Sequence, residues 1–533
     1  MKYYFTFLLL VVYCVMFSQE DAWVYFKGKP SAQTYLDNPL TMLTQRALDR
    51  RTNQNISLNL TDVPLEAAYI NQVKLNSGIT VMAQSKWLNA LHIRGTQTNI
   101  LSLKLLSFVD KVVFANKNLN TTSRKVSENQ VFQSKDKLKT TINYSYGSSA
   151  NQIQMLNGQV LHQQNYTGSG KIIAVLDAGF PGVNTAQPFR KLIDNNQILG
   201  GYDFVNRNND FYTGDDHGTM VLSTMGGYKE NALVGTAPDA SYYLFITEYD
   251  PTENPVEESY WVEAAEEADR LGVDIITTSL GYFGFDNANY SHTYSDMNGT
   301  TNFISRGAEI AFSKGIVVVA SAGNEGNTAE PHVGAPADAV SVITVGAVTA
   351  SKTKSPFSSI GPSYDLRIKP DVMAQGTAAV ISNTSGNITT VNGTSFSCPI
   401  MAGMIACLWQ AFPSKTNKEI RQMVLQSSDR YANPDNNYGY GIPNFGLTLG
   451  VEDYKTSVSV FSVYPNPAQT TVSFLFENSK ASVSVYSVLG QKIIEKQITS
   501  QNPILSVEAL KSGLYFYTFD ADGLHKTGKI IKQ

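Results

Sequence analysis

The chain has 533 residues, which is too long for one ordinary hydrophobic core and predicts three or four domains. Hydrophobic residues make up 42% of the chain and charged residues 16%, a composition typical of folded globular proteins and not of disordered ones. The formal net charge of −4 offers no basic surface of the kind that nucleic-acid binding requires, so we expect no nucleic-acid partner.

The first twenty residues, MKYYFTFLLLVVYCVMFSQE, combine one Lys with an apolar run from Phe5 to Phe17. This pattern predicts a secretory signal peptide over residues 1–18 and therefore an exported protein. The run is too short for a comfortable membrane span, and no other stretch approaches about 20 apolar residues, so we expect no transmembrane segment in the mature protein. Tyr13 before Cys14 argues against a lipoprotein signal, which needs small residues there.

Two cysteines, Cys398 and Cys407, remain once the signal peptide is set aside. They lie nine positions apart on one predicted helix, on opposite faces, and cannot pair with each other. We therefore expect an exported protein whose stability comes from large cores and not from a disulfide framework.

Residues 19–118 form a mixed segment, with a predicted helix at 65–70 and predicted strands at 79–84 and 109–115. Residues 119–150 are dominated by Asn, Thr, Ser, Lys and Gln and lose apolar periodicity. This composition predicts a polar linker or exposed loop, which is a place for proteolytic processing.

Residues 151–450 alternate short apolar runs with amphipathic helices, the latter at 257–271 and 303–314. Continuous apolar strands joined through helices predict an α/β fold, with a parallel sheet covered by helices on both faces. In such sheets the functional residues gather at the carboxyl ends of the strands. The predicted strands cover residues 171–177, 241–247, 273–280, 315–323 and 340–348.

After about residue 455 apolar and polar residues alternate with a period of two between turn signals. The alternation predicts strands with one buried face each. Residues 455–533 should therefore form a small antiparallel β-sandwich.

The stretch NGTSFSCP, residues 392–399, places Ser395 immediately before a long apolar helical pattern. Pro399 is compatible with a first helical turn, so Ser395 or Thr394 should lie at or next to a helix N-terminus, where free N–H groups favour negative charge. A Ser or Thr cap before a core helix would give the same local pattern, and other residues must decide between the two interpretations.

Three further side chains lie where chemistry is expected. Asp177 ends the apolar strand KIIAVLD, where a carboxylate needs a hydrogen-bonding partner, although a solvated turn Asp is the alternative. His217, in DDHGTMV, begins a short predicted helix, although it could simply be a capping or surface His. Asn324 follows another buried strand, where its amide can donate to an oxyanion, or it is a simple turn residue. The order Asp, His, Ser is that of the subtilisin-type triad.

The segment from 151 to 450 resembles the subtilisin-like serine peptidases, the S8 family of subtilases. The resemblance rests on six blocks in the family's order: VLDAGF, DDHGTMV, SLGY, SAGNEG, KPDVMAQG and NGTSFSCPIMAG. It implies a serine endopeptidase in which Ser395 is the nucleophile, His217 the general base and acid, Asp177 the orienting carboxylate and Asn324 an oxyanion donor. A peptide bond would be hydrolysed through an acyl-enzyme intermediate.

The resemblance also implies where substrate binds. Two short segments would line the pocket for the side chain before the cut and pair with the substrate backbone. Their residues are Ser279, Leu280, Gly281, Ser321, Ala322 and Gly323.

No cofactor is required for this chemistry and no metal site is predicted. Structural calcium is common in the family, but no ligands for it can be assigned here. One departure from the family pattern is Ala178, where many members carry Ser or Thr, and a small effect is expected from it.

Both flanks carry resemblances of their own. By position and coarse pattern, residues 19–118 resemble a subtilase pro-region, a small α+β domain that assists folding and inhibits until it is cleaved within 119–150. The C-terminal motifs VYPNPA, SVLGQKI, LKSGLYFYTF and GKIIK resemble the C-terminal sorting domain of type IX secretion in Bacteroidetes-like bacteria. They imply the type IX secretion machinery as a partner and a secreted or cell-surface location.

Two other functions stay open at this point. A catalytically silent protein with the same fold could serve as a binding or adhesion module, or the enzyme could be a maturase dedicated to one exported partner. The acidic residues between positions 248 and 258 could favour basic substrates, although a solvated loop and helix start is the preferred interpretation.

Overall fold

The computed structural model describes residues 19–120, 144–449, 462–464, 468–476, 480–488, 490–499, 502–521 and 524–532. The predicted signal peptide and most of the predicted linker lie outside these residues, so their predictions stay open. The chain divides into two compact units, Met1–Leu449 and Gly450–Gln533, and each is described by itself.

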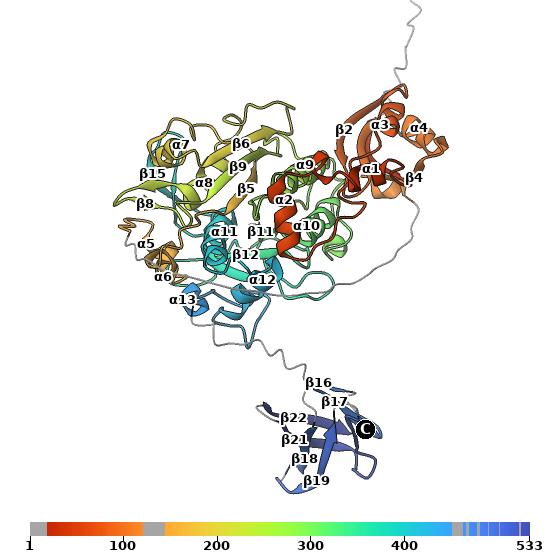
Figure 1. Cartoon of the computed structure of the whole chain (residues 1–533), viewed down its shortest axis with the longest axis vertical. Coiled ribbons are helices and arrows are strands. Elements are labelled where there is room, and N and C mark those ends of the chain that lie inside the picture. Colours follow the sequence, from red (N-terminus) through yellow and green to blue (C-terminus); the bar gives the residue numbers. More distant parts are fainter. Residues whose placement is uncertain are drawn as a thin grey trace, which may run out of the picture. The chain divides into compact units, whose positions relative to one another are not determined.

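The larger unit begins with a four-stranded antiparallel sheet in the order β2-β3-β1-β4. Helices α3 and α4 pack against it around a core of Val, Ile, Leu and Phe side chains. The segment between β1 and α3 contains α1 and α2, and it brings α2 against α9 of the following domain (Figure 1). The strands are β1 Gln19–Phe26, β2 Ile79–Ser85, β3 Ala90–Thr96 and β4 Val109–Phe114, and the helices are α1 Ala32–Leu36, α2 Gln45–Asn53, α3 Ala67–Lys74 and α4 Gln97–Ser102.

The centre of the larger unit is a seven-stranded sheet in the order β13-β12-β11-β10-β5-β9-β6, in which every neighbouring pair is parallel. Each of the five strands predicted from apolar runs is present, whereas the edge strands β6 and β13 were not predicted. The strands are β5 Ile172–Asp177, β6 Ile198–Asp203, β9 Ser241–Ile246, β10 Ile275–Thr278, β11 Val317–Ser321, β12 Ile343–Val348 and β13 Val372–Gln375.

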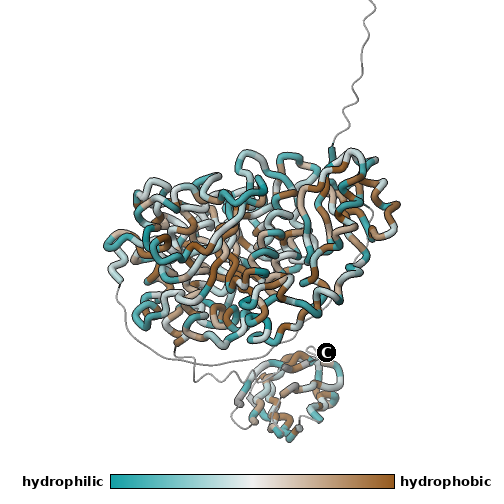
Figure 2. The backbone as a smooth tube through the Cα atoms, turned by 45° about the horizontal axis from the view of Figure 1, so that its top comes forward, coloured by the Kyte–Doolittle hydropathy of each residue, from teal (hydrophilic) through white to brown (hydrophobic). Residues whose placement is uncertain are grey.

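Successive side chains of a strand point to opposite faces of the sheet, and here both sets are buried in a core. On β11, Val317 and Val319 join the core beneath α8 and α11, whereas Val318 joins the core beneath α9 and α10. The hydropathy of the backbone follows this arrangement, with hydrophobic segments crossing the interior and hydrophilic segments in the loops (Figure 2). The prediction of a parallel sheet with helices on both faces is confirmed.

The remaining elements of the larger unit surround this sheet. The helices are α5 Ala150–Gln154, α6 Gln159–Gln163, α7 Arg190–Asp194, α8 His217–Gly226, α9 Val256–Leu271, α10 Phe303–Ser313, α11 Thr394–Ala411, α12 Asn417–Gln426 and α13 Phe445–Thr448. Two short antiparallel pairs join β7 Tyr228–Lys229 to β8 Leu233–Val234 and β14 Ala379–Ser382 to β15 Ile388–Val391. Cys398 and Cys407 are both buried on α11 as free thiols.

The smaller unit consists of two antiparallel sheets, β16-β17-β20 and β19-β18-β21-β22, whose apolar residues form one shared core. This is the predicted β-rich C-terminal region. Its strands are β16 Ser462–Tyr464, β17 Thr471–Leu475, β18 Lys480–Ser487, β19 Lys492–Thr499, β20 Ile504–Ser506, β21 Gly513–Ala521 and β22 Leu524–Lys532.

Within the described part of the chain, no helix is both long and apolar enough to span a bilayer.

Candidate active site

Asp177 and His217 meet at the carboxyl edge of the central sheet. Asp177 is the last residue of β5 and is fully buried, and His217 is the first residue of α8. His217 Nδ1 lies 2.7 Å from Asp177 Oδ1, which also accepts a hydrogen bond from the Ala178 amide at 2.9 Å. When Nδ1 donates to a carboxylate, Nε2 of the neutral ring is left as a proton acceptor.

Gly218 explains how helix α8 comes this close to the end of β5. A Cβ atom at this position would lie 2.4 Å from the carbonyl oxygen of Gly179 and 3.0 Å from Cβ of Asp177. A larger residue after His217 would therefore push the helix away from the strand and lengthen the bond between imidazole and carboxylate.

The surroundings of His217 favour its charged form. Burial alone would lower the pKa of His217, but the charge of Asp177 and the hydrogen bond to it, followed by the charges of Glu248 and Asp215, raise the pKa to about 9. In the free protein at neutral pH the imidazolium is therefore stabilised. Loss of a neighbouring negative charge would make the neutral ring more available.

Ser395 is the second residue of α11 and is 8% exposed. The predicted helix N-terminus is confirmed, but Pro399 lies in the second turn and not in the first. Since Pro399 has no N–H to donate to the Ser395 carbonyl, that carbonyl instead accepts a hydrogen bond from Ser279 Oγ at 2.8 Å. Ser279 thus compensates for the proline and fixes the first turn of the helix.

Ser395 and His217 are neighbours without a direct bond. Ser395 Oγ donates a long hydrogen bond of 3.4 Å to the Ser279 carbonyl, and no hydrogen bond joins it to His217 among the described residues. The ring of Phe396, the next residue, lies 5.8 Å from the His217 ring between centroids.

Asn324 is held by the residue that precedes Ser395. Its Oδ1 accepts hydrogen bonds from the amide of Thr394 at 3.0 Å and from Thr394 Oγ1 at 3.1 Å. With Oδ1 engaged, the Nδ2 group of this residue is left as a donor without a partner among the described residues. Asn324 and Ser395 line the same cavity.

This cavity has a volume of about 410 Å³ and includes most of the predicted substrate-binding residues. Those that line it are Ser279, Gly281, Ser321, Ala322 and Gly323. Of the six predicted residues, Leu280 is not part of this lining.

Leu280 does not line the cavity. Its side chain is 6% exposed and belongs to the core beneath α9 and α10, because alternate residues of an extended segment point to opposite sides. The side chain of Leu280 thus adds nothing to this cavity, and the pairing of this segment with the substrate backbone stays a prediction.

Ala322 lines the cavity and also packs in the core. The residue is fully buried, and its methyl group packs in the same core as Leu280. Its amide donates a hydrogen bond of 3.0 Å to the Val345 carbonyl and is therefore not free to pair with a substrate backbone. Ala322 thus belongs to the wall of the pocket, and the pairing of its segment with the substrate backbone stays a prediction.

Several residues of the lining were not predicted as site residues. The acidic ones are Glu248, Glu253, Glu325 and Glu330. Glu248 follows the carboxyl end of β9, a position that could have singled it out. The preferred interpretation of the acidic run as solvated was also wrong in part, since Glu257 and Glu258 are 1% and 0% exposed at the start of α9.

Comparison with protein families identifies the central domain. Residues 168–441 match the model of the subtilase family, peptidase S8, over half of the chain. The chain belongs to the subtilase family. It is 33% identical to Subtilisin NAT from Bacillus subtilis subsp. natto over 295 residues, which is 55% of this chain and 69% of that protein. Subtilisin E from Bacillus subtilis (strain 168) gives the same identity and the same coverage.

This subtilase is therefore a subtilisin-like serine peptidase, a hydrolase. Serine protease AprX from Bacillus subtilis (strain 168) is 29% identical over 318 residues, or 54% of this chain and 67% of that protein. Among solved structures, the crystal structure of MycP1 from the ESX-1 type VII secretion system matches 58% of this chain and 88% of that one, with a TM-score of 0.44 and 22% identity.

Both flanks of the subtilase also match families. Residues 21–133 match the peptidase S8 propeptide domain of Bacteroidota, and residues 462–533 match the secretion system C-terminal sorting domain. The sorting domain assigns the subtilase to type IX secretion and to an extracellular or cell-surface location.

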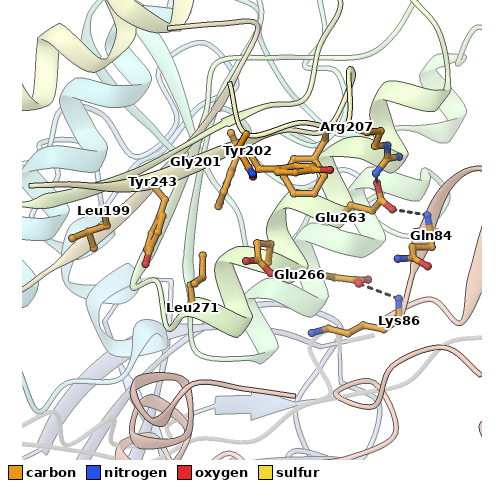
Figure 3. Close-up of a pocket in the computed structure, with 15 residues that line it drawn as sticks. Gln84, Lys86, Leu199, Gly201, Tyr202, Arg207, Tyr243, Glu263, Glu266 and Leu271 are labelled. Carbon is orange, nitrogen blue, oxygen red and sulfur yellow. Dashed lines mark hydrogen bonds and ion pairs between the residues drawn. The ribbon is translucent and has the colours of Figure 1, made fainter. Parts of the chain in front are cut away.

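Two acidic side chains of α9 accept hydrogen bonds from backbone amides of the propeptide domain. Glu263 accepts a hydrogen bond from the Gln84 amide at 2.8 Å, and Glu266 accepts one from the Lys86 amide at 3.0 Å (Figure 3). Glu266 also accepts a hydrogen bond from the Trp87 amide at 2.9 Å. Burial raises the pKa of Glu263 to about 7, although Arg207 and the Gln84 amide oppose the shift. A cavity of about 630 Å³ lies at this contact.

The described residues contain no group of three or more His, Cys, Asp or Glu side chains placed to hold a metal ion. Structural calcium therefore stays a prediction without assigned ligands.

Proposed function

We propose that the protein is a secreted serine endopeptidase in which Asp177, His217 and Ser395 form the catalytic triad. The observation that carries the proposal is the 2.7 Å bond between buried Asp177 and His217, next to a serine at the N-terminus of a buried helix. In this arrangement the carboxylate orients the ring and stabilises the imidazolium that forms during the reaction.

The first half of the reaction forms an acyl-enzyme. Ser395 Oγ rotates from the Ser279 carbonyl, transfers its proton to His217 Nε2 and attacks the carbonyl carbon of the substrate. The developing oxyanion is stabilised by the Ser395 amide, which lies in the first helical turn without an intrahelical partner, and by Nδ2 of Asn324. The imidazolium then protonates the leaving amine as the peptide bond breaks.

The second half releases the acyl group. Water gives a proton to His217 Nε2 and attacks the ester carbonyl, and the same donors stabilise the second oxyanion. Collapse of this intermediate returns the proton to Ser395 Oγ and frees the carboxylic acid product.

The proposal is tested by comparing residues 19–533 with the Ser395→Ala variant of the same chain. The parent should lose its propeptide, react with a serine-directed fluorophosphonate and digest casein. The Ser395→Ala variant should stay full length, unlabelled and inert. If a folded parent and its variant behave alike, the peptidase mechanism is wrong and a binding module is favoured. If the parent is labelled but cleaves only proteins of its own secretome, it is a dedicated maturase.

A further inference from the structure

The cavity beside Ser395 is strongly acidic. Four carboxylates line it, and no Lys or Arg occurs among the described residues of its lining. Two of the four have partners of their own. Glu325 Oε2 accepts a hydrogen bond from Ser359 Oγ at 2.9 Å, and Glu330 is bonded to His332.

Glu248 is a third carboxylate of this lining, and one of its oxygens has no hydrogen-bond partner among the described residues. This oxygen, Oε2, is buried. Burial raises the pKa of Glu248 well above its usual range, and the charges of Glu253 and Asp177 raise it further, whereas His217 lowers it. A buried carboxylate without a partner is costly, and a bound cation would remove much of that cost.

Glu253 lies in the same lining and is also unpaired. Its carboxylate makes no hydrogen bond or ion pair with the other described residues. Burial raises the pKa of Glu253 to about 7, and the negative charges of Asp286, Asp250 and Glu258 act in the same direction. The side chains around it therefore add negative charge and do not neutralise it.

These two carboxylates lie where a bound peptide would place its side chains. The same cavity is lined by Ser279, Gly281 and the nucleophile Ser395, and the charge of Glu248 acts on the ring of His217. A volume of about 410 Å³ lies within the range of ordinary ligand pockets. The acidic side of the cavity is thus adjacent to the reacting groups and not remote from them.

Given the proposed peptidase function, we propose that Glu248 and Glu253 bind the cationic side chain of a Lys or Arg in the substrate, at one of the two positions immediately before the cut. A long aliphatic stem would lie along the cavity while its ammonium or guanidinium group supplies the missing positive charge. The enzyme would therefore select basic peptides.

This pairing would also act on the catalytic base. Glu248 is one of the charges that raise the pKa of His217. A substrate cation next to Glu248 offsets that charge, so the neutral imidazole becomes more available as a proton acceptor when the right substrate is bound. Selectivity would then be expressed in kcat as well as in KM.

The test uses internally quenched peptides of one sequence that carry Arg or citrulline, its neutral isostere, at the last or the penultimate position before the cut. Mature enzyme is compared with its Glu248→Gln and Glu253→Gln variants. The control is Asp250→Asn, which removes an exposed charge from the same loop outside the cavity lining. We expect kcat/KM to favour Arg over citrulline by about 30-fold or more at one position. Glu248→Gln should reduce this preference to about 5-fold or less, and Asp250→Asn should preserve it.

Binding is measured in parallel on the Ser395→Ala variant, by fluorescence anisotropy of the same peptides. Tighter binding of the Arg peptide, lost in the Ser395→Ala, Glu248→Gln double variant, supports the acidic subsite even if turnover is slow. Equal binding and equal kcat/KM for Arg and citrulline overturn it. If such an enzyme still digests casein and reacts with the fluorophosphonate, the subsite fails while the peptidase proposal stands. If neither the parent nor any variant is labelled but the Arg peptide binds selectively, the peptidase proposal fails while the acidic subsite stands.

Discussion

Acidic residues of the subtilase unit occur in two regions whose surroundings differ. Near the C-terminal end of α9, Asp269 is fully buried between two propeptide arginines, with Oδ1 bonded to Arg50 and Oδ2 2.8 Å from Arg51 Nη2. Near its N-terminal end, Glu248 and Glu253 line the cavity beside Ser395 without any cation among the described residues.

The difference appears in the direction of the pKa shifts. Burial would raise the pKa of Asp269, but the charges of Arg50 and Arg51 hold it below its usual value. Glu248 has no Lys or Arg partner of this kind, and burial raises its pKa well above the usual value of a glutamate. A paired buried acid contributes to the fold of the precursor, whereas an unpaired one in a cavity is available to a ligand.

The largest expected effect is on the paired acid. Asp269→Asn, made in the Ser395→Ala precursor to prevent self-cleavage, leaves Arg50 buried without its counter-charge and leaves Arg51 with Asp62 alone. We expect a loss of stability of about 3–5 kcal/mol, measured as a lower urea midpoint. The control is Glu267→Gln on the same helix, which breaks a half-exposed pair with Arg270 and should cost less than about 1 kcal/mol. Equal effects of the two variants would contradict the comparison.

Substitution of the unpaired Glu248 should raise the stability of the precursor, whereas Asp269→Asn should lower it. Glu248→Gln in the same precursor removes a buried charge without a partner and should raise the urea midpoint by the equivalent of about 1–2 kcal/mol at pH 8.5. The pKa of Glu248 is higher in the folded than in the unfolded chain, so its ionisation destabilises the fold as pH rises. The gain should therefore shrink at pH 4, where the carboxyl is protonated in the folded state and mostly protonated in the unfolded state. A loss of stability at pH 8.5 would show that Glu248 has a partner.

A smaller effect is expected on the pH dependence of activity. His217 must be neutral to accept the Ser395 proton, and its pKa is about 9, so kcat/KM for a citrulline peptide should rise with pH through this value. Glu248→Gln removes one of the charges that raise this pKa and should move the acidic limb to lower pH by less than about one unit. Asp250→Asn serves as the control. An acidic limb that moves to higher pH, or does not move, would show that Glu248 does not raise the pKa of His217.

The smallest effect concerns Ala178, the departure from the family pattern. Oδ2 of Asp177 is buried and has no hydrogen-bond partner among the described residues, while Oδ1 holds His217. Ala178→Ser introduces a hydroxyl beside this carboxylate and should stabilise the protein by about 1 kcal/mol, read from the thermal midpoint. We expect kcat/KM to change less than about threefold, and a tenfold change would mean that Oδ2 takes part in orienting the ring.

Much of the fold could be predicted from local patterns. The apolar run that ends at Asp177 and the apolar face that follows Ser395 are local signals for a buried strand and a buried helix, and both are present. The edge strand β6 was missed because its run ILGGYD contains two glycines and lacks a continuous apolar pattern.

The details of the site depend on contacts between distant segments, which local patterns do not contain. Ser279 donates to the carbonyl that Pro399 leaves free, across more than a hundred residues of sequence. Resemblance placed Leu280 and Ala322 in the pocket, and it did not indicate that both side chains also pack in the core or that the Ala322 amide is bonded to the neighbouring strand β12.

The acidic run shows the same limit. It was noticed in the sequence, yet only the folded chain separates its buried members Glu257 and Glu258 from Glu248 and Glu253 in the cavity. Burial and charge pairing of a carboxylate depend on which segments surround it, and the spacing of the run does not contain that information.

The packing of Trp23 should allow maturation to be followed by tryptophan fluorescence. The chain has four tryptophans, and two of them, Trp23 and Trp87, belong to the propeptide. Trp23 stacks on Phe303 at 5.2 Å between centroids and donates a hydrogen bond to Ser259 Oγ at 2.9 Å, and Trp87 is 3% exposed in the same core. Departure of the propeptide transfers both indoles to water. A red shift of the emission spectrum should therefore report release in real time, without a label.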